Sequence, residues 1–351
     1  MSRAPGDPFG VVVTADGRWS FVSSPGGPGG GGIGVFANAG TGAPRLVRTI
    51  PAPSALGVVL THDGRYLLAA SGSGAAVVSV PQAEAGATHR VLGTLSSPRI
   101  GRFGGGAIEV AVSPDDRFAF VSIEYSDEIA VFNLQRAVAG GFRTSGFVGE
   151  IPMGIAPVGM AVSPDGRWLY ATSELGSSRA TRGPAVRGQG TLSVISLSKA
   201  ETDPAHSVVA VAMAGCGSVR VITSADGSVV WVTARESDML LGFSAARLLT
   251  DPSHALAAEV RVGEAPVGLA LVGGGQRIVV ADSNRFGLKR AAANLAVVNV
   301  AAALAGKPAL AGYLPAGGFP RQMALEPGGR TLLVTNFASQ QLEAVNVTAL
   351  P

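Results

Sequence analysis

The stretch AVSPDGRWLYATSE, which runs from Ala161 to Glu174, decides the fold, because a close relative of it returns along the whole chain. It consists of a short apolar run, a Pro-Asp-Gly turn and a second apolar run. This order predicts two antiparallel strands, since glycine supplies the positive φ that a tight turn between strands requires.

Seven segments of the chain align with this stretch. They are GVVVTADGRWSFVSS from Gly10, GVVLTHDGRYLLAAS from Gly57, EVAVSPDDRFAFVSI from Glu109, GMAVSPDGRWLYATS from Gly159, RVITSADGSVVWVTA from Arg220, GLALVGGGQRIVVADS from Gly268 and QMALEPGGRTLLVTN from Gln322. Their spacing of roughly 50 residues indicates stacked supersecondary units, none of which can bury its apolar faces alone.

Each repeat is predicted to contain four strands. A third strand, such as IAVFNL or LAVVNV, follows a variable loop, and a fourth, such as FVGEIP or LAGYLP, closes most repeats. Helical periodicity is confined to short stretches near Ala245–Leu249 and Ala301–Ala305. The sequence therefore predicts an all-β fold, a seven-bladed β-propeller with mostly four-stranded antiparallel blades. We expect one domain over residues 1–351, with blades starting near residues 9, 56, 108, 158, 219, 267 and 321.

The last repeat departs from this pattern. It ends at LEAVNVTALP with no fourth strand behind it, and only MSRAPGDP precedes the first repeat. Prolines make this N-terminal segment a poor strand. We therefore expect the seventh blade to have three strands or a very short outer fourth strand.

Composition limits the classes of partner. Hydrophobic residues make up 47% of the chain and charged residues 15%, so a large core can be buried. The net charge of +3 comes without a run of Lys or Arg, and aromatic residues make up only 6%, which argues against a nucleic-acid partner. No apolar run approaches the ~18 residues that span a bilayer, so we expect no membrane partner.

The N-terminal residues and the single cysteine bear on the cellular compartment of the protein. The first residues carry no apolar segment of signal-peptide length, and Cys216 alone makes no disulfide framework. We expect a cytoplasmic monomer, with export open if a signal peptide has been removed.

The segments LYATSE, LLVTNFASQQLEAVNV and SPDGR resemble the YVTN-repeat propellers, which include the YncE-like proteins. They also resemble the related seven-bladed lactonase family, typified by the propeller-type 6-phosphogluconolactonase. This resemblance implies a Pro-Arg-His motif that enters an inner strand. Its closest match here is FPRQMAL, in which Pro320 and Arg321 agree and Gln322 stands in place of the histidine. The resemblance carries over Arg321 alone as a site residue.

The first strand of each blade should line the central channel. The aligned first residues of these strands are Gly10, Gly57, Glu109, Gly159, Arg220, Gly268 and Gln322. Glycine is expected there because seven chains crowd at the axis, and three blades depart from it with polar side chains. Two interpretations stay open: Glu109 and Arg220 are solvated or paired in a water-filled channel, or they belong to a small-molecule site at its mouth.

A second ring should surround the first on the same face, at the end of the second strands. It consists of Pro25, Gly72, Glu124, Glu174, Arg235, Asn284 and Phe337. Acidic groups from blades three and four would then face basic groups from blade five. Such a layout suits acid–base chemistry on an oxygen-rich molecule, or simple binding of one.

The hypotheses assign roles to these two rings. Candidate catalytic residues are Glu109, Glu174, Arg220 and Arg321, and candidate ligand-binding residues are Glu124, Arg235, Asn284 and Gln322. Three carboxylates would also suit Ca²⁺ or Mg²⁺. The neighbouring arginines compete for them, so we expect no metal and no cofactor.

Three hypotheses about the function remain open. The first is binding of a small polar or anionic molecule at the channel mouth. The second is a lactonase- or isomerase-type enzyme with a glutamate as acid or base and an arginine that stabilises negative charge. The third is a protein-interaction scaffold, which the polar ring disfavours.

Two long basic loops and four histidines also bear on the candidate site. The basic loops Leu175–Gly190 and Asn284–Asn294 are either a lid over the site or solvated loops. The four histidines are expected to lie away from the channel, which argues against histidine-based metal or triad chemistry.

Overall fold

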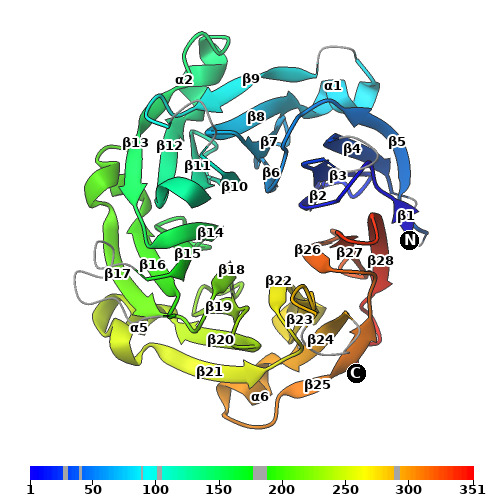
Figure 1. Cartoon of the computed structure of the whole chain (residues 1–351), viewed down its shortest axis with the longest axis vertical. Helices are drawn as coiled ribbons and strands as arrows, with labels where there is room; N and C mark the ends of the chain where they lie inside the picture. The colour runs from blue at the N-terminus through cyan, green and yellow to red at the C-terminus, as the bar shows by residue number, and fades with distance from the viewer. Residues whose placement is uncertain (27–30, 39–41, 88–89, 101–104, 177–187, 288–292) are drawn as a thin grey trace.

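The computed structural model describes the chain except for residues 27–30, 39–41, 88–89, 101–104, 177–187 and 288–292. Seven four-stranded antiparallel sheets stand around a central channel like the blades of a propeller (Figure 1). The predicted seven-bladed β-propeller is confirmed, with the first strand of every blade innermost.

The strands of the seven blades fall into four concentric layers. The innermost strands are β2 (Val11–Val13), β6 (Val58–Leu60), β10 (Ala107–Val112), β14 (Ile155–Val162), β18 (Ser218–Thr223), β22 (Pro266–Val272) and β26 (Pro320–Leu325). The second strands are β3 (Trp19–Ser24), β7 (Tyr66–Ser71), β11 (Phe118–Ile123), β15 (Trp168–Leu175), β19 (Val229–Ala234), β23 (Arg277–Asp282) and β27 (Thr331–Asn336). The third strands are β4 (Gly32–Ala37), β8 (Gly74–Ser79), β12 (Glu128–Asn133), β16 (Thr191–Ser196), β20 (Met239–Ser244), β24 (Asn294–Asn299) and β28 (Gln341–Asn346). The outermost strands are β5 (Arg45–Ile50), β9 (Val91–Ser96), β13 (Phe147–Pro152), β17 (Val208–Met213), β21 (Leu256–Arg261), β25 (Leu310–Pro315) and β1 (Ser2–Arg3).

The seventh blade is closed by the N-terminal end of the chain. The two residues of β1 pair antiparallel with β28, Ser2 opposite Leu342 and Arg3 opposite Gln341. The expected three-stranded form of this blade is therefore wrong, and the very short outer fourth strand is what the structure contains. Beyond this pair, the backbone N–H of Ala4 donates to the carbonyl of Gln340 at 2.9 Å. Pro5 follows and has no backbone N–H to donate.

Short helices connect several third strands to the outer ones. They are α1 (Val80–Ala85), α2 (Leu134–Ala139), α4 (Leu197–Ala200), α5 (Ala245–Thr250) and α6 (Val300–Leu304). The helical periodicity seen near Ala245–Leu249 and Ala301–Ala305 thus corresponds to α5 and α6. Four of these helices start with an Asn or Ser N-cap whose side chain accepts from the backbone N–H three residues on.

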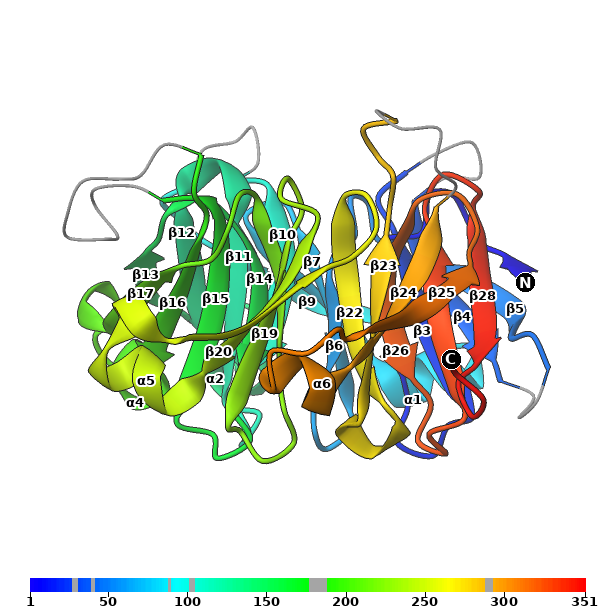
Figure 2. The ribbon, with the colours of Figure 1, turned by 90° about the horizontal axis from the view of Figure 1, so that it is seen from below.

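The Asp-Gly turns between first and second strands share one hydrogen-bond pattern. In the fourth blade, the Ser163 hydroxyl donates to Asp165, whose carboxylate also accepts from the backbone N–H of Arg167. The same contacts recur in blades one, two, three and five. These aspartates therefore serve the turn, as expected from their regular repetition, and they lie on the lower face of the propeller as drawn in Figure 2.

The core lies between neighbouring blades rather than inside any one of them. Second strands are buried on both sides; every residue of β11, for example, is buried. One interface packs Phe120 of the third blade with Leu169 and Ile195 of the fourth. Each blade therefore depends on both neighbours for the burial of its apolar faces.

A hydroxyl group on the second strand ties most blades to the next one. In the fourth blade, Thr172 Oγ1 accepts from the backbone N–H of Gly159, 3.0 Å away, and donates to the carbonyl of Val219 in the fifth blade at the same distance. Ser23, Ser122, Thr233 and Thr335 make the corresponding contacts to the carbonyls of Leu56, Val158, Val267 and Phe9. Thr335 thereby joins the last blade to the first.

The close approach of neighbouring blades explains the glycines of the first ring. A Cβ on Gly159 would lie 2.4 Å from the carbonyl oxygen of Val219, and one on Gly268 would lie 2.1 Å from that of Arg321. Backbone of the next blade occupies the space that a side chain would need, so glycine is favoured at these positions.

Substitution of Thr172 by Val is expected to lower the free energy of unfolding by about 2 kcal/mol. The change keeps the side-chain volume but leaves two buried backbone groups without their partner, each of which costs roughly 1–3 kcal/mol when unmet. Urea denaturation followed by circular dichroism measures it. Thr202→Val, at an exposed position, is the matched control; equal effects in the two variants would contradict the bridging role.

Candidate functional site

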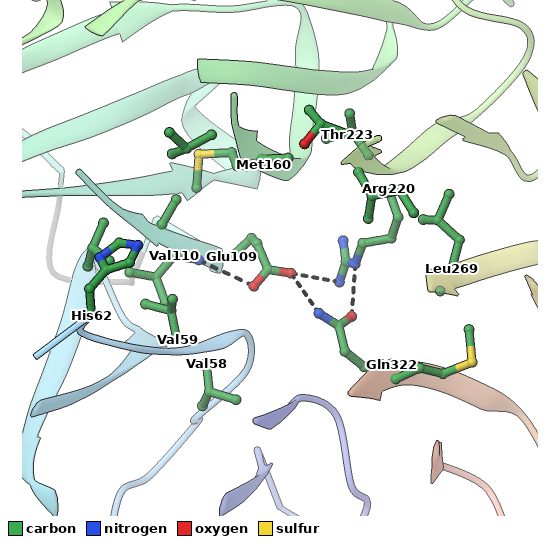
Figure 3. A pocket seen from close by; sticks show the side chains of 18 residues that line it. Val58, Val59, His62, Glu109, Val110, Met160, Arg220, Thr223, Leu269 and Gln322 are labelled. Atoms are coloured by element: carbon green, nitrogen blue, oxygen red, sulfur yellow. Dashed lines mark hydrogen bonds and ion pairs between the residues drawn. The ribbon is translucent and has the colours of Figure 1, made fainter. Parts of the chain in front are cut away.

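Three polar residues of the first ring meet inside the channel. Glu109 on β10, Arg220 on β18 and Gln322 on β26 point toward one another (Figure 3). Arg220 Nη2 lies 3.3 Å from Glu109 Oε2, and Arg220 Nε donates to Gln322 Oε1 at 3.1 Å. Gln322 Nε2 lies 3.5 Å from Glu109 Oε2, which closes a triangle that we call the central cluster.

The central cluster is almost removed from solvent. Glu109 and Arg220 are each 6% exposed, and Arg220 also donates to the carbonyl of Val158 at 3.2 Å. Burial raises the pKa of Glu109, while the Arg220 guanidinium acts in the opposite direction. The expectation that these two charges are paired across the channel agrees with this geometry.

Above the central cluster lies a cavity of about 160 Å³, which we call the upper cavity. Its apolar lining comes from Ile108, Val158, Val219 and Val267. Its charged lining comes from Glu124, Glu174, Arg220, Arg235, Arg285 and Arg321. Four arginines against two glutamates give this small cavity an excess of positive charge.

Arg321 is the one charged member of an otherwise apolar ring. The residues that directly precede the first ring are Phe9, Leu56, Ile108, Val158, Val219, Val267 and Arg321. Most of the apolar members form a buried cluster, and the Arg321 guanidinium carbon lies 3.7 Å from the centre of the Phe9 ring. Arg321 Nε is buried without a hydrogen-bond partner among the described residues.

This environment changes the protonation equilibria of the site. Burial lowers the pKa of Arg321 well below its usual range, and three neighbouring guanidiniums lower it further. Those guanidiniums belong to Arg220, Arg285 and Arg235. Burial, followed by the nearby Glu174 carboxylate, raises the pKa of Glu124. The crowded cations thus repel one another, and Glu124 keeps its proton to a higher pH than an exposed glutamate.

The remaining polar contacts order the rim of the upper cavity. Arg235 Nη2 donates to Glu174 Oε2 at 2.8 Å, and the Arg235 guanidinium lies 5.7 Å from the centre of the Phe286 ring. Arg285 lies 5.6 Å from the rings of both Phe286 and Phe319. Cation–π contacts of this kind hold guanidiniums in place without neutralising their charge.

Sequence reasoning located most of this site. Glu124, Glu174, Arg220, Arg235 and Arg321 line the upper cavity, whereas Glu109 and Gln322 lie below it in the central cluster. Asn284 lines neither cavity; its backbone N–H donates to the carbonyl of Glu264 at 3.0 Å. Residues 177–187 of the first basic loop and residues 288–292 of the second, which the sequence suggested as a lid, lie outside the described residues.

Two features of the site were missed. Arg285 was missed because it directly follows Asn284, the residue of blade six that the alignment assigned to the second ring. Arg285 nevertheless lines the upper cavity. The expectation that every histidine lies away from the channel is wrong for His62, which lines a cavity at the lower end of the channel. His62 lies in the turn that follows β6, and its Nδ1 lies 2.7 Å from Oδ1 of Asp116 in the next blade.

The described residues contain no group of three His, Cys, Asp or Glu side chains arranged to hold a metal ion. Glu109 is separated from Glu124 and Glu174 by its position in the central cluster. Within the same residues, no helix has the length and apolar character needed to span a membrane.

Comparison with known proteins identifies the family. The family model described as "Lactonase, 7-bladed beta-propeller" matches residues 52–285. The chain therefore belongs to this family of seven-bladed β-propellers. No curated protein matches it in sequence.

Several solved structures share the architecture. Hydrazine synthase of Kuenenia stuttgartiensis has a TM-score of 0.73 at 14% identity and covers 98% of this chain and 96% of its own. The Cps50 (Swd1) β-propeller domain of Myceliophteria thermophila has a TM-score of 0.68 at 12% identity, with 98% of both chains covered. A chain of the mitotic checkpoint complex has a TM-score of 0.71 at 13% identity, over 99% of this chain and 90% of its own. Such distant likenesses show the fold alone.

Replacing Glu109 by Gln is expected to lower the free energy of unfolding by about 3 kcal/mol, because it leaves the buried Arg220 guanidinium without its counter-charge. The double variant with Arg220→Gln should lose less than the sum of the two single losses, by about 1–3 kcal/mol. Urea denaturation of the four proteins measures this coupling.

Arg261→Gln serves as the control for a charge loss at the surface. It removes an ion pair with Asp238 in which the Arg261 side chain is 68% exposed. An effect of at most about 1 kcal/mol is expected. Zero coupling would show that the ion pair between Glu109 and Arg220 does not contribute to stability.

Proposed function

We propose that this protein binds a small anionic molecule in the upper cavity, at the mouth of its central channel. The observation that carries the proposal is the placement of Arg321 in an otherwise apolar ring, surrounded by three further arginines. A charge placed there costs free energy unless a partner of opposite sign compensates it.

The charges of the cavity favour an anion over a cation or a neutral molecule. Glu174 is already paired with Arg235, and Glu109 with Arg220, so Arg285 and Arg321 are the cations left with the weakest compensation. A carboxylate or phosphate group matches the planar, multiply donating guanidinium. The apolar floor of Ile108, Val158 and Val219 strengthens such contacts by excluding water.

Isothermal titration with gluconate and with inorganic phosphate, at about 50 mM salt, tests this proposal. Wild-type protein is expected to bind at least one of these anions and not glucose, which has no charge. Arg321→Gln should weaken binding at least ~tenfold, equivalent to about 1.4 kcal/mol, because it removes one charge-assisted contact.

Arg143→Gln is the matched control, because Arg143 is exposed on a surface turn. It should bind the anion as wild type does. Equal binding by wild type and Arg321→Gln, or no binding of either anion, would contradict the proposed site. Melting curves of each variant verify that the protein remains folded.

A second candidate is lactone hydrolysis, which family membership together with the two glutamates of the cavity supports. In this scheme the Glu174 carboxylate, held by Arg235, accepts a proton from the attacking water. Arg321 stabilises the negative charge that forms on the carbonyl oxygen when water adds to the carbonyl carbon. The C=O bond then re-forms as the ring C–O bond breaks. Glu124, whose pKa is raised, donates a proton to the departing oxygen.

Turnover of aldonic-acid lactones, corrected for uncatalysed hydrolysis, tests this candidate. Glu124→Gln should lower kcat about 100-fold or more, because the general acid is lost. The wild-type rate should fall as pH rises through the raised pKa of Glu124, since only its protonated form donates. A rate equal to the uncatalysed one would leave anion binding as the function and exclude hydrolysis of this class.

A further inference from the structure

A second, larger cavity opens at the lower end of the channel, on the far side of the central cluster. Its volume is about 440 Å³, within the range typical of small-molecule sites. Innermost strands of blades two to seven contribute its walls, which run from the central cluster toward His62 at the rim (Figure 3). We call it the lower cavity.

Most of the residues that line the lower cavity are apolar, and the polar ones are His62, Glu109, Arg220, Thr223 and Gln322. Val59, Met160, Leu269 and Met323 are among the lining side chains, and Met160 and Met323 remain partly exposed. Exposed apolar side chains facing a concave space are unfavourable in water and are stabilised by an apolar occupant. Methionine side chains also adapt their shape to what they contact.

The inner end of the lower cavity is polar and loosely bonded. Glu109 Oε1 lies 3.4 Å from the backbone N–H of Val110, and the contacts within the central cluster measure 3.1–3.5 Å. Only 6% of Arg220 is exposed to solvent. Among the described residues, its Nη2 atom has no hydrogen-bond acceptor of suitable geometry. A hydrogen-bond donor, Arg220, and an acceptor, Glu109, are therefore both present at the inner end of the lower cavity.

The two cavities are separate sites. Of the described residues that line either one, Arg220 alone lines both, so the central cluster forms the partition between them. The upper cavity has an excess of arginines, whereas the ion pair at the end of the lower cavity is balanced. They therefore call for ligands of different charge.

We propose that the lower cavity binds a neutral amphipathic molecule with an apolar body and a carboxamide-like head. The body would contact the valine, leucine and methionine walls. The N–H of the head would donate to the Glu109 carboxylate, and its carbonyl oxygen would accept from Arg220 Nη2. A carboxylate head would instead face the Glu109 charge, and an ammonium head would face Arg220, and each would leave an uncompensated charge in a buried place.

A series of probes with one tail and four heads tests this proposal. The probes are octanamide, octanoate, octylammonium and 1-octanol, titrated into the full-length protein at pH 7 and followed by ligand-observed NMR or calorimetry. Octanamide is expected to bind at least ~tenfold more tightly than either charged probe, and more tightly than the alcohol.

Two variants locate the binding. Met323→Lys places a cation in the apolar wall and should abolish octanamide binding, whereas Met213→Lys, the same change on the exposed outer strand β17, should leave it unchanged.

Each alternative result is decisive. Octanamide binding that survives Met323→Lys would place the molecule elsewhere and overturn the proposal. Stronger binding of octanoate than of octanamide would overturn the neutral head. Because Met323 does not line the upper cavity, Met323→Lys should still bind the anions tested there, so failure of one site is distinguishable from failure of the other.

Discussion

The rest of the structure depends on one hydrogen-bonded bridge, in which a hydroxyl on the second strand of a blade joins two neighbouring innermost strands. Thr172 illustrates it: the hydroxyl accepts from Gly159 and donates to Val219 of the next blade. The oxygen of the hydroxyl satisfies one backbone group and its proton another, so the bridge holds neighbouring innermost strands close together. The crowded axis and the narrow channel follow from this close approach. Glycine occupies four of the seven first-ring positions, where atoms of the next blade leave little room for a side chain.

A narrow channel brings together charges that lie far apart in the sequence. Glu109 and Arg220 come from the third and fifth blades, yet their side-chain atoms lie 3.3 Å apart. The Gln322 amide contacts both charges at once, as acceptor from Arg220 and donor toward Glu109. The central cluster thus divides the channel into an upper cavity with surplus cations and a lower cavity with apolar walls.

Arg321 shows how a single substitution in a repeat creates a candidate site. Six of the seven equivalent positions are apolar and pack around the channel mouth, as Phe9 and Val158 do. An arginine at the seventh position is desolvated by this ring and stacked on Phe9. The repeat places apolar residues at the other six positions. Electrostatic interactions of the Arg321 charge are therefore stronger than they would be in water.

The sequence by itself determined the repeat, the number of blades, the face on which polar residues gather and most residues of the upper cavity. It succeeded because strand alternation and turn chemistry are local and recur in every repeat. Only the tertiary structure decided that Glu109 and Arg220 pair, that Arg285 joins the upper cavity, that Asn284 does not, and that His62 reaches the lower cavity. The two-residue strand β1 likewise appears only when the ring closes, because its partner β28 lies at the other end of the chain. These facts depend on distances between blades, which no local pattern encodes.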